Sequence, residues 1–389
     1  MTGFLVRHLV KDWEKTEDPA VRERYGVLSG AVGILLNLLL CAGKFAAGIL
    51  TGAISITADA FNNLSDAASS VVTLVGFRMA GQKADRDHPF GHGRIEYLAG
   101  LAVSVLILVV GVELGKSSIE KIIHPEAVEF TWLSAGILLV SVLVKLWMSR
   151  FNRVLSKRID SAAMAATATD SLSDAVATSA VLAGLLISGF AHVQVDGWIG
   201  LLVAVFILRA GAGAAKDTLN PLLGQPPAPE LVDNIEHTIL SHPQIVGVHD
   251  LVIHDYGPGR CMMSVHAEVP AESDMMEVHD VIDHVERELK ERYHLEAVIH
   301  MDPIDSSDPK TTALRDKVAK LAREIDPAIT IHDFRVTPGP LLTNLIFDAV
   351  VPYEVKLTDE EVKQTLEQKV KALDERYYTV VEIDRCYVR

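Results

Sequence analysis

Asn62-Asn-Leu-Ser-Asp66 and Asp170-Ser-Leu-Ser-Asp174 are matching polar segments, and each lies inside an otherwise apolar stretch of the chain. Each pair of outer residues is four positions apart, so in a helix both side chains point from one face. A carboxylate at bilayer depth is costly and is usually functional. Two facing helices can therefore offer Asn62, Asp66, Asp170 and Asp174 as four oxygen ligands for a divalent cation, which indicates a metal transport site. The alternative is that these side chains only bond neighbouring helices.

Six apolar stretches run through the first half of the chain, and each approaches the roughly 20 residues that a bilayer-spanning helix needs. They lie near residues 26–50, 53–80, 97–122, 131–149, 161–190 and 195–219. Several contain Gly or Asp, which is typical of helices that face a polar cavity. We therefore expect a multi-pass, α-helical membrane domain with six transmembrane helices over residues 26–220, after a cytoplasmic N-terminal segment at residues 1–25.

The basic residues of the short loops predict the orientation of these helices. One side carries most of them: Arg22, Arg24, Lys83, Arg86, Arg94, Arg150, Arg153, Lys157 and Arg158. On the other side, Lys116 and Lys121 are offset by Glu120, Glu126 and Glu129, and the 188–196 loop has no Lys or Arg. The positive-inside rule then places both termini in the cytoplasm. Lys44 and Lys145 lie within apolar stretches, and we expect them to extend toward the membrane surface.

The charge of the chain is concentrated in its second half. Residues 226–389 contain 32 Asp and Glu against 17 Lys and Arg, whereas the first 225 residues contain 19 of each class. An acidic surface argues against a nucleic-acid partner and suits the handling of cations. The phosphate-binding pattern GxxxxGK[ST] does not occur, so we expect no use of ATP.

The acidic half predicts two similar α+β units after a proline-rich linker at residues 221–229. The first unit, 230–305, has a helix near 230–241, strands near 245–255 and 261–269, a helix near 275–293 and a strand near 296–302. The second, 306–389, repeats this order: helix 312–325, strands 328–336 and 342–351, helix 358–376 and strand 378–386. His249-Asp-Leu matches His332-Asp-Phe, and Val269-Pro matches Val351-Pro. The alternative is that two α+β patterns agree by chance.

Several motifs together resemble the cation diffusion facilitator family, over roughly residues 20–305. The membrane motifs are Ala58-Asp-Ala-Phe-Asn62-Asn-Leu-Ser-Asp66 and Asp170-xxx-Asp174. The loop between them contains Asp85-Arg-Asp-His88-Pro-Phe-Gly-His92-Gly-Arg-Ile-Glu96. The soluble half adds His249-Asp-Leu, His266, His279 and His300-Met-Asp302-Pro. Residues 306–389 are not part of the family's common pattern.

The resemblance implies a six-helix metal–proton antiporter, not an enzyme, with a cytoplasmic ferredoxin-like or metallochaperone-like domain through which two copies form a homodimer. Zinc exporters of the family commonly carry a histidine in the membrane site. The set Asn62, Asp66, Asp170 and Asp174 has none, and hard oxygen ligands suit Mn²⁺. We therefore expect proton-coupled export of Mn²⁺ across the plasma membrane. Zn²⁺ or Fe²⁺ export, or a membrane-anchored metal sensor, are the alternatives.

Two further metal sites follow from the resemblance. Asp85, His88 and His92 match a second metal position in the loop, with a glycine-rich turn of solvated side chains as the alternative, and Glu96 is favoured as the partner of a basic residue. In the soluble domain, His249, His266, His279, His300 and Asp302 match positions that bind a binuclear cluster at the dimer interface of zinc-exporting relatives, with surface histidines as the alternative. The second unit has a mostly carboxylate version of this set, for which a solvated acidic face is favoured: His332, Asp348, Glu361, Glu382 and Asp384.

Overall fold

The computed structural model describes residues 2–16, 18–51, 54–124, 131–191, 196–258, 260–304 and 308–386. Glu126, Glu129 and residues 192–195 of the 188–196 loop, which entered the charge comparison, lie outside these ranges. The chain divides into two compact units. The membrane unit comprises Met1–Gln225 and Asp255–Arg260, and the soluble unit comprises Pro226–His254 and Cys261–Arg389.

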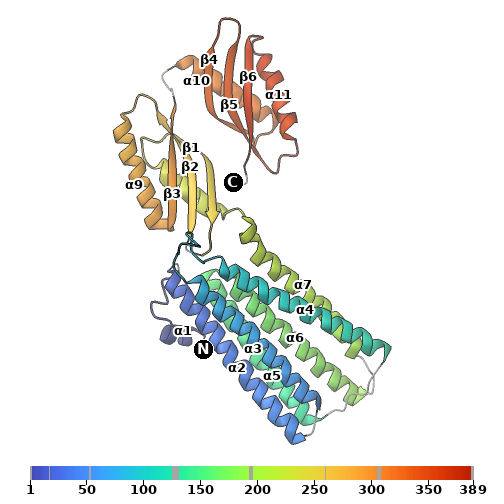
Figure 1. Cartoon of the computed structure of the whole chain (residues 1–389). Coiled ribbons are helices and arrows are strands. Elements are labelled where there is room, and N and C mark those ends of the chain that lie inside the picture. Colours follow the sequence, from blue (N-terminus) through green and yellow to red (C-terminus); the bar gives the residue numbers. More distant parts are fainter. Residues whose placement is uncertain are drawn as a thin grey trace. The chain divides into compact units, whose positions relative to one another are not determined.

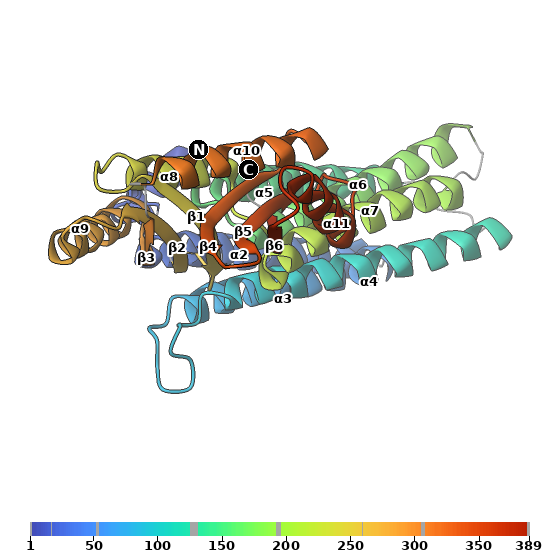
Figure 2. The same cartoon turned by 90° about the horizontal axis from the view of Figure 1, so that it is seen from above.

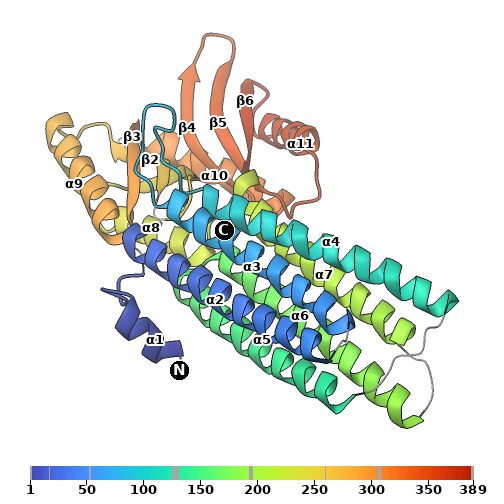
Figure 3. The same cartoon turned by 60° about the horizontal axis from the view of Figure 1, so that its bottom comes forward.

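The membrane unit is a bundle of long helices that run side by side (Figures 1 and 3). After the short α1 (Thr2–Leu9), they are α2 (Pro19–Thr51), α3 (Ile54–Ala80), α4 (Ile95–Ile123), α5 (Trp132–Ile159), α6 (Ala162–Ala191) and α7 (Asp196–Leu223). At 27 to 33 residues each, they are about 40–50 Å long and exceed the ~30 Å hydrocarbon core of a bilayer. Within the described residues, α2, α4, α5 and α7 meet the length and composition of membrane spans. The expected multi-pass helical architecture is confirmed.

Polar side chains join the helices of this bundle, as is usual where lipid provides no hydrophobic driving force for association. The Ser29 hydroxyl donates to Asn152 Oδ1 at 2.8 Å and links α2 to α5. The hydroxyls of Thr73 and Thr167 lie 2.9 Å apart and link α3 to α6. A Cβ atom at Gly100 would lie 2.8 Å from the Ala163 Cα atom, so only glycine permits this approach of α4 and α6. The helices that carry the polar segments, α3 and α6, are therefore linked directly by the Thr73 and Thr167 hydroxyls.

The soluble unit begins with an α+β fold that follows the expected order of elements. Its elements are α8 (Pro229–Leu240), β1 (Gly247–Asp255), β2 (Cys261–Pro270), α9 (Met275–Tyr293) and β3 (Leu295–Ile304). The sheet order is β1-β2-β3, with β2 and β3 parallel and His266 beside His300. Apolar residues of α8, α9 and the sheet form its core, among them Ile235, Val265 and Leu289.

The second α+β fold repeats the first. Its elements are α10 (Pro309–Ile325), β4 (Thr330–Pro338), β5 (Thr343–Pro352), α11 (Asp359–Lys371) and β6 (Tyr377–Cys386). The sheet order is β4-β5-β6, with β4 and β5 antiparallel and β5 and β6 parallel. It has a separate core that includes Phe347, Leu366 and Val351. Figure 2 gives a second view of both sheets.

The His-Asp pairs mark the same backbone feature in both repeats. Asp250 follows His249 with φ of 53°, and Asp333 follows His332 with φ of 52°. This left-handed conformation is uncommon outside glycine, and Asp is among the residues that tolerate it. Its recurrence at matching positions argues against chance agreement of the two patterns.

The second helix of the second repeat is shorter than expected. It ends at Lys371 rather than near residue 376, because a turn follows in which the Asp374 carbonyl accepts from Tyr377 N. It begins with a capping box, in which Thr358 and Glu361 satisfy each other's backbone N–H groups. Glu361 therefore serves as a helix cap and not as a member of an acidic ligand set.

Candidate metal sites

The polar segments of α3 and α6 meet at a buried lysine from α5. Lys145 Nζ lies 2.6 Å from Asp66 Oδ2 and 2.6 Å from Asp174 Oδ2. The Lys145 side chain is only 4% exposed, whereas those of Asp66 and Asp174 are 17% and 20% exposed. A positive charge therefore lies between two of the four predicted transport ligands.

The other two predicted ligands lie one helical turn before the paired carboxylates, Asp170 on α6 and Asn62 on α3. Asp170 is within electrostatic range of Asp174, Asp66 and Lys145. Asn62 is exposed, one helical turn before Asp66 on α3. Asp66, Asp170 and Asp174 are not among the described groups whose ligand atoms all lie within 4.8 Å of one another. The arrangement thus has Lys145 Nζ, and not a compact carboxylate cage, at its centre.

The expectation that both membrane lysines extend toward the surface is wrong. The buried Lys145 ammonium group donates hydrogen bonds to the Asp66 and Asp174 carboxylates, and Lys44 Nζ donates to the Asn63 amide oxygen at 3.1 Å. A buried ammonium group requires such partners. The signal that was available in the sequence was a lysine inside one apolar stretch while two other stretches carry several carboxylates.

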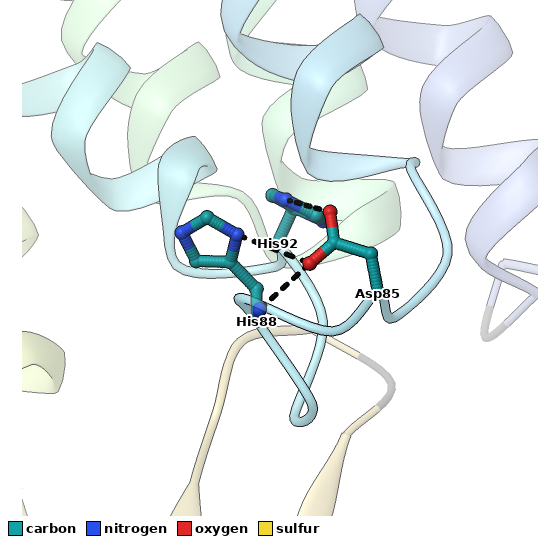
Figure 4. A group of neighbouring side chains, drawn as sticks. All are labelled: Asp85, His88 and His92. Carbon is teal, nitrogen blue, oxygen red and sulfur yellow. Dashed lines mark hydrogen bonds and ion pairs between the residues drawn. The ribbon is translucent and has the colours of Figure 1, made fainter.

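The loop between α3 and α4 brings Asp85, His88 and His92 together (Figure 4). Asp85 Oδ1 lies 3.3 Å from His88 Nδ1, and Asp85 Oδ2 lies 3.5 Å from His92 Nε2. The backbone N–H of His88 donates to the Asp85 carboxylate at 2.7 Å, and this bond lowers the pKa of Asp85 below its ordinary value. The three side chains can offer two imidazole nitrogens and a carboxylate to one ion.

This loop is braced by the Asp255–Arg260 segment, which belongs to the membrane unit. Tyr97 donates its hydroxyl proton to Asp255 Oδ2 at 2.8 Å, and Arg94 donates to the Asp255 carbonyl. A Cβ atom at Gly93 would lie 2.9 Å from the Tyr256 carbonyl oxygen and 3.1 Å from Gly257 Cα. Glycine is therefore needed directly after His92 for this approach, which supports an ordered loop.

Glu96 is confirmed as the partner of a basic residue. Its carboxylate lies 3.2 Å from Arg22 Nη2, and the two side chains are 3% and 9% exposed. Arg22 Nη1 also donates to the carbonyl oxygen of Ile159. The pair links the starts of α2 and α4 to the end of α5.

In the first α+β fold, His249, His266 and Asp302 converge. Asp302 Oδ2 lies 2.9 Å from His266 Nδ1 and 3.3 Å from His249 Nε2. His300 stands beside them, with its Nε2 atom 3.3 Å from Asp302 Oδ1 and its ring 65% exposed. His279 is exposed on α9 and joins no ligand group among the described residues. Four of the five expected side chains thus gather on one side of the sheet.

One further group was not anticipated from the sequence. His242, at the end of α8, lies near His284 and Glu288 of α9. The His242 Nε2 atom is 3.7 Å from Glu288 Oε2, and Arg292 also pairs with Glu288 at 2.7 Å. The spacing of four between His284 and Glu288 on a helix was the available signal. Arg292 already neutralises the carboxylate, which weakens this group as a cation site.

Comparison with known proteins places these features in a family context. The family profile described as the cation efflux transmembrane domain matches residues 31–223. The profile of the cation efflux protein cytoplasmic domain matches residues 227–304. Neither match extends into the second α+β fold.

Three relatives illustrate the similarity. An uncharacterized transporter of Methanocaldococcus jannaschii is 30% identical over 275 residues, which are 70% of this chain and 97% of the relative. The manganese efflux system protein MneS of Bacillus subtilis is 29% identical over 294 residues, 73% of this chain and 99% of the relative. The cation-efflux pump FieF of Salmonella newport is 29% identical over 291 residues, 73% of this chain and 95% of the relative.

Proposed function

The chain belongs to the cation diffusion facilitator family of metal transporters, and on that premise we propose that it exports Mn²⁺ across the plasma membrane in exchange for protons. The similarity to MneS and to FieF is equal at 29% identity, so it does not choose between manganese and other cations. The choice of Mn²⁺ rests on the donor atoms.

The proposed transport ligands are the side chains of Asn62, Asp66, Asp170 and Asp174. All four donors are oxygen atoms, and Mn²⁺ accepts carboxylate, carbonyl and water ligands readily. Zn²⁺ is usually bound with at least some nitrogen or sulfur ligands. Because Mn²⁺ binds most sites more weakly than Fe²⁺ or Zn²⁺ does, selectivity must come from geometry and from metal availability.

The position of Lys145 is the observation that carries the proposal. Its ammonium group lies 2.6 Å from both Asp66 and Asp174, which supports a position for a cation between these carboxylates. A divalent ion that binds the same oxygens has to move the ammonium group aside. We propose that Lys145 occupies the carboxylates between transport events and shifts within the same polar group when the metal ion arrives, so that its charge stays beside the aspartates.

Charge balance supports proton exchange at this site. Three aspartates contribute three negative charges and Lys145 contributes one positive charge, so a divalent ion makes the group neutral. In the absence of metal, two protons achieve the same neutrality. Since uncompensated charge is costly at bilayer depth and metal ligands must be deprotonated, we propose that two protons exchange for each metal ion.

The remaining parts of the chain have supporting roles in this proposal. Both termini are cytoplasmic, because the basic loops lie on their side of the bundle. Two copies associate through the cytoplasmic domain at residues 230–305. The Asp85, His88 and His92 group and the His249, His266, His279, His300 and Asp302 group hold regulatory ions, with His279 able to reach a partner copy because it is exposed.

A flux assay with purified protein in liposomes tests this function. Metal uptake is followed for Mn²⁺, Fe²⁺, Zn²⁺ and Mg²⁺ separately, with and without a pH gradient. We expect uphill Mn²⁺ flux that requires the gradient. Preferential Zn²⁺ or Fe²⁺ flux would reassign the substrate, and uphill flux that requires ATP and no gradient would contradict antiport.

A further inference from the structure

The second α+β fold contains a ligand group that its sequence did not favour. His332, Asp348 and Asp384 each have a ligand atom within 4.8 Å of the others. The strand pairing explains this, because His332 of β4 lies directly opposite Asp348 of β5, and Asp384 of β6 lies two residues beyond the partner of Asp348. Residues in such cross-strand positions are close enough to interact. The favoured view of a solvated acidic face does not hold for His332, whose side chain is buried.

His332 is buried without satisfying its ring nitrogens. Its side chain is 7% exposed, and neither nitrogen makes a hydrogen bond with the described residues. Nε2 lies 3.4 Å from Asp384 Oδ2, which is close enough for an ion pair but does not give hydrogen-bond geometry. Buried polar groups without partners are rare in proteins and require an explanation. An ion or other group that is bound by His332 provides one.

The first α+β fold supplies a further carboxylate to this group. Asp250 Oδ1 lies 3.6 Å from His332 Nε2, and the rings of His249 and His332 stack with centroids 4.1 Å apart. Asp250 Oδ2 also lies 3.3 Å from His249 Nδ1, so the same carboxylate approaches both histidines. Asp250 therefore lies between the His249, His266 and Asp302 group and the His332 group.

We propose that the second α+β fold binds a divalent transition-metal ion through His332, Asp348 and Asp384, with Asp250 as an additional partner from the first fold. One imidazole and two or three carboxylates form a donor set that suits Mn²⁺, Fe²⁺, Co²⁺ or Zn²⁺. Magnesium is disfavoured, because it prefers oxygen ligands and retains its waters. The ion would join the two folds, since Asp250 and His332 come from different ones.

The relation between the repeats supports this site. His332, Asp348 and Asp384 occupy the positions that His249, His266 and Asp302 occupy in the first fold, and both sets converge. Only the middle ligand changes, from imidazole to carboxylate. The site is also accessible, because a surface hollow lined by Ile346, Asp348 and Glu382 reaches its Asp348 side.

An ion pair without metal is the competing explanation. In that case a protonated His332 would supply a single positive charge to three carboxylates, those of Asp250, Asp348 and Asp384. Two carboxylates lie within 3.6 Å of the single His332 Nε2 atom, and a third belongs to the same group. One imidazolium leaves an excess of negative charge there, whereas a divalent ion would compensate more of it.

Zn²⁺ binding to the full-length protein in detergent tests the proposal. Bound Zn²⁺ is counted after equilibrium dialysis, with excess Mg²⁺ present to occupy weak carboxylate sites. We expect His332→Ala and Asp384→Asn each to lose one bound Zn²⁺ per chain. Glu382→Gln, which removes an exposed carboxylate two residues from Asp384 on the same strand, is the matched control and should keep the wild-type count.

A second variant separates this ion from its neighbour. His266→Ala should lose the ion of the first fold, and the double variant His266→Ala/His332→Ala should lose one more. If the double variant binds as much Zn²⁺ as His266→Ala, His332 only supports the first site and the proposal is wrong. If His332→Ala aggregates, Asp384→Asn becomes the test, because Asp384 is only partly buried. A folded Asp384→Asn variant that binds as many Zn²⁺ ions per chain as the wild type would overturn the proposal. Neither result depends on whether the protein transports metal.

Discussion

Lys145 Nζ lies 2.6 Å from Asp174 Oδ2 within the helix bundle, and the same ammonium group lies at an equal distance from Asp66. A lysine from α5 thus joins carboxylates from α3 and α6. Such an ammonium group competes with any cation for the same oxygens. Substitutions that remove or keep the positive charge of Lys145 should therefore affect the binding and the release of a metal ion differently.

We expect Lys145→Gln to increase the apparent affinity for Mn²⁺ and to lower the maximal flux. The neutral amide no longer repels the metal ion, and a repulsion of only about 1.4 kcal/mol corresponds to a tenfold change in affinity. Release slows because the ammonium group no longer replaces the departing ion. Equilibrium Mn²⁺ binding and initial flux rates in liposomes measure the two effects separately.

Lys145→Arg is the control for this experiment, because it keeps the positive charge while it changes the shape of the donor group. Its affinity should remain closer to that of the wild type than the affinity of Lys145→Gln does. Weaker Mn²⁺ binding in Lys145→Gln would mean that the lysine supports the metal site and does not compete with it.

Asn62→His should shift the preference of the transporter from Mn²⁺ toward Zn²⁺. The substitution adds a nitrogen donor one helical turn from Asp66, and imidazole suits Zn²⁺ better than an amide oxygen does. The ratio of Zn²⁺ to Mn²⁺ flux in the same liposome preparation measures the shift. Asn63→His is a neighbouring control, since Asn63 bonds Lys44 instead. An unchanged ratio in Asn62→His would exclude residue 62 from the ligands.

Arg22→Ala should destabilise the membrane unit by about 3–5 kcal/mol, because it leaves the buried Glu96 carboxylate without its partner. Arg24→Ala is the matched control. Arg24 pairs with Asp12 at 3.9 Å and both side chains are about half exposed, so the loss should not exceed about 1 kcal/mol. Denaturant unfolding in detergent compares the two variants. Equal losses of unfolding free energy in the two variants would show that burial does not make the Arg22–Glu96 pair more important for stability than the exposed Arg24–Asp12 pair.

His249 should titrate above its ordinary value of 6.5 in the metal-free protein. Burial lowers the pKa of this imidazole, but the carboxylates of Asp250, Glu268 and Asp302 outweigh burial and raise it. A raised folded-state pKa stabilises the fold fully below pH 6.5, and this contribution is lost as the pH rises through the folded value. NMR titration of the histidine ring measures the midpoint, and Asp250→Asn should lower it. A wild-type midpoint below 6.5 would contradict this assignment.

The architecture was largely predictable from the sequence, because it depends on periodicity and on turn residues. The apolar stretches gave the six long helices to within a few residues at most ends, and the order of elements in both α+β folds was correct. The end of α11 was missed because Leu373 continues the apolar pattern, while Asp374 and the following residues form a turn. The match between His249-Asp and His332-Asp correctly identified equivalent backbone positions.

The electrostatic relations within the sites were less predictable. Spacing alone placed Asp66 and Asp174 on facing helices, but it did not indicate that Lys145 of a third helix lies between them. Carboxylate-rich composition favoured a solvated face around Asp348, whereas burial of His332 depends on contacts with the first fold. Such contacts join residues that are distant in the chain, and no local pattern specifies them.

The most direct test of the central claim is simultaneous measurement of Mn²⁺ flux and proton flux in liposomes, with Asp174→Asn as the comparison. We predict that the wild-type protein moves two protons against each Mn²⁺ ion, and that Asp174→Asn, which removes a ligand and a proton carrier together, moves neither while it remains folded. Normal Mn²⁺ flux in Asp174→Asn, or wild-type Mn²⁺ flux without any proton movement, would contradict the account.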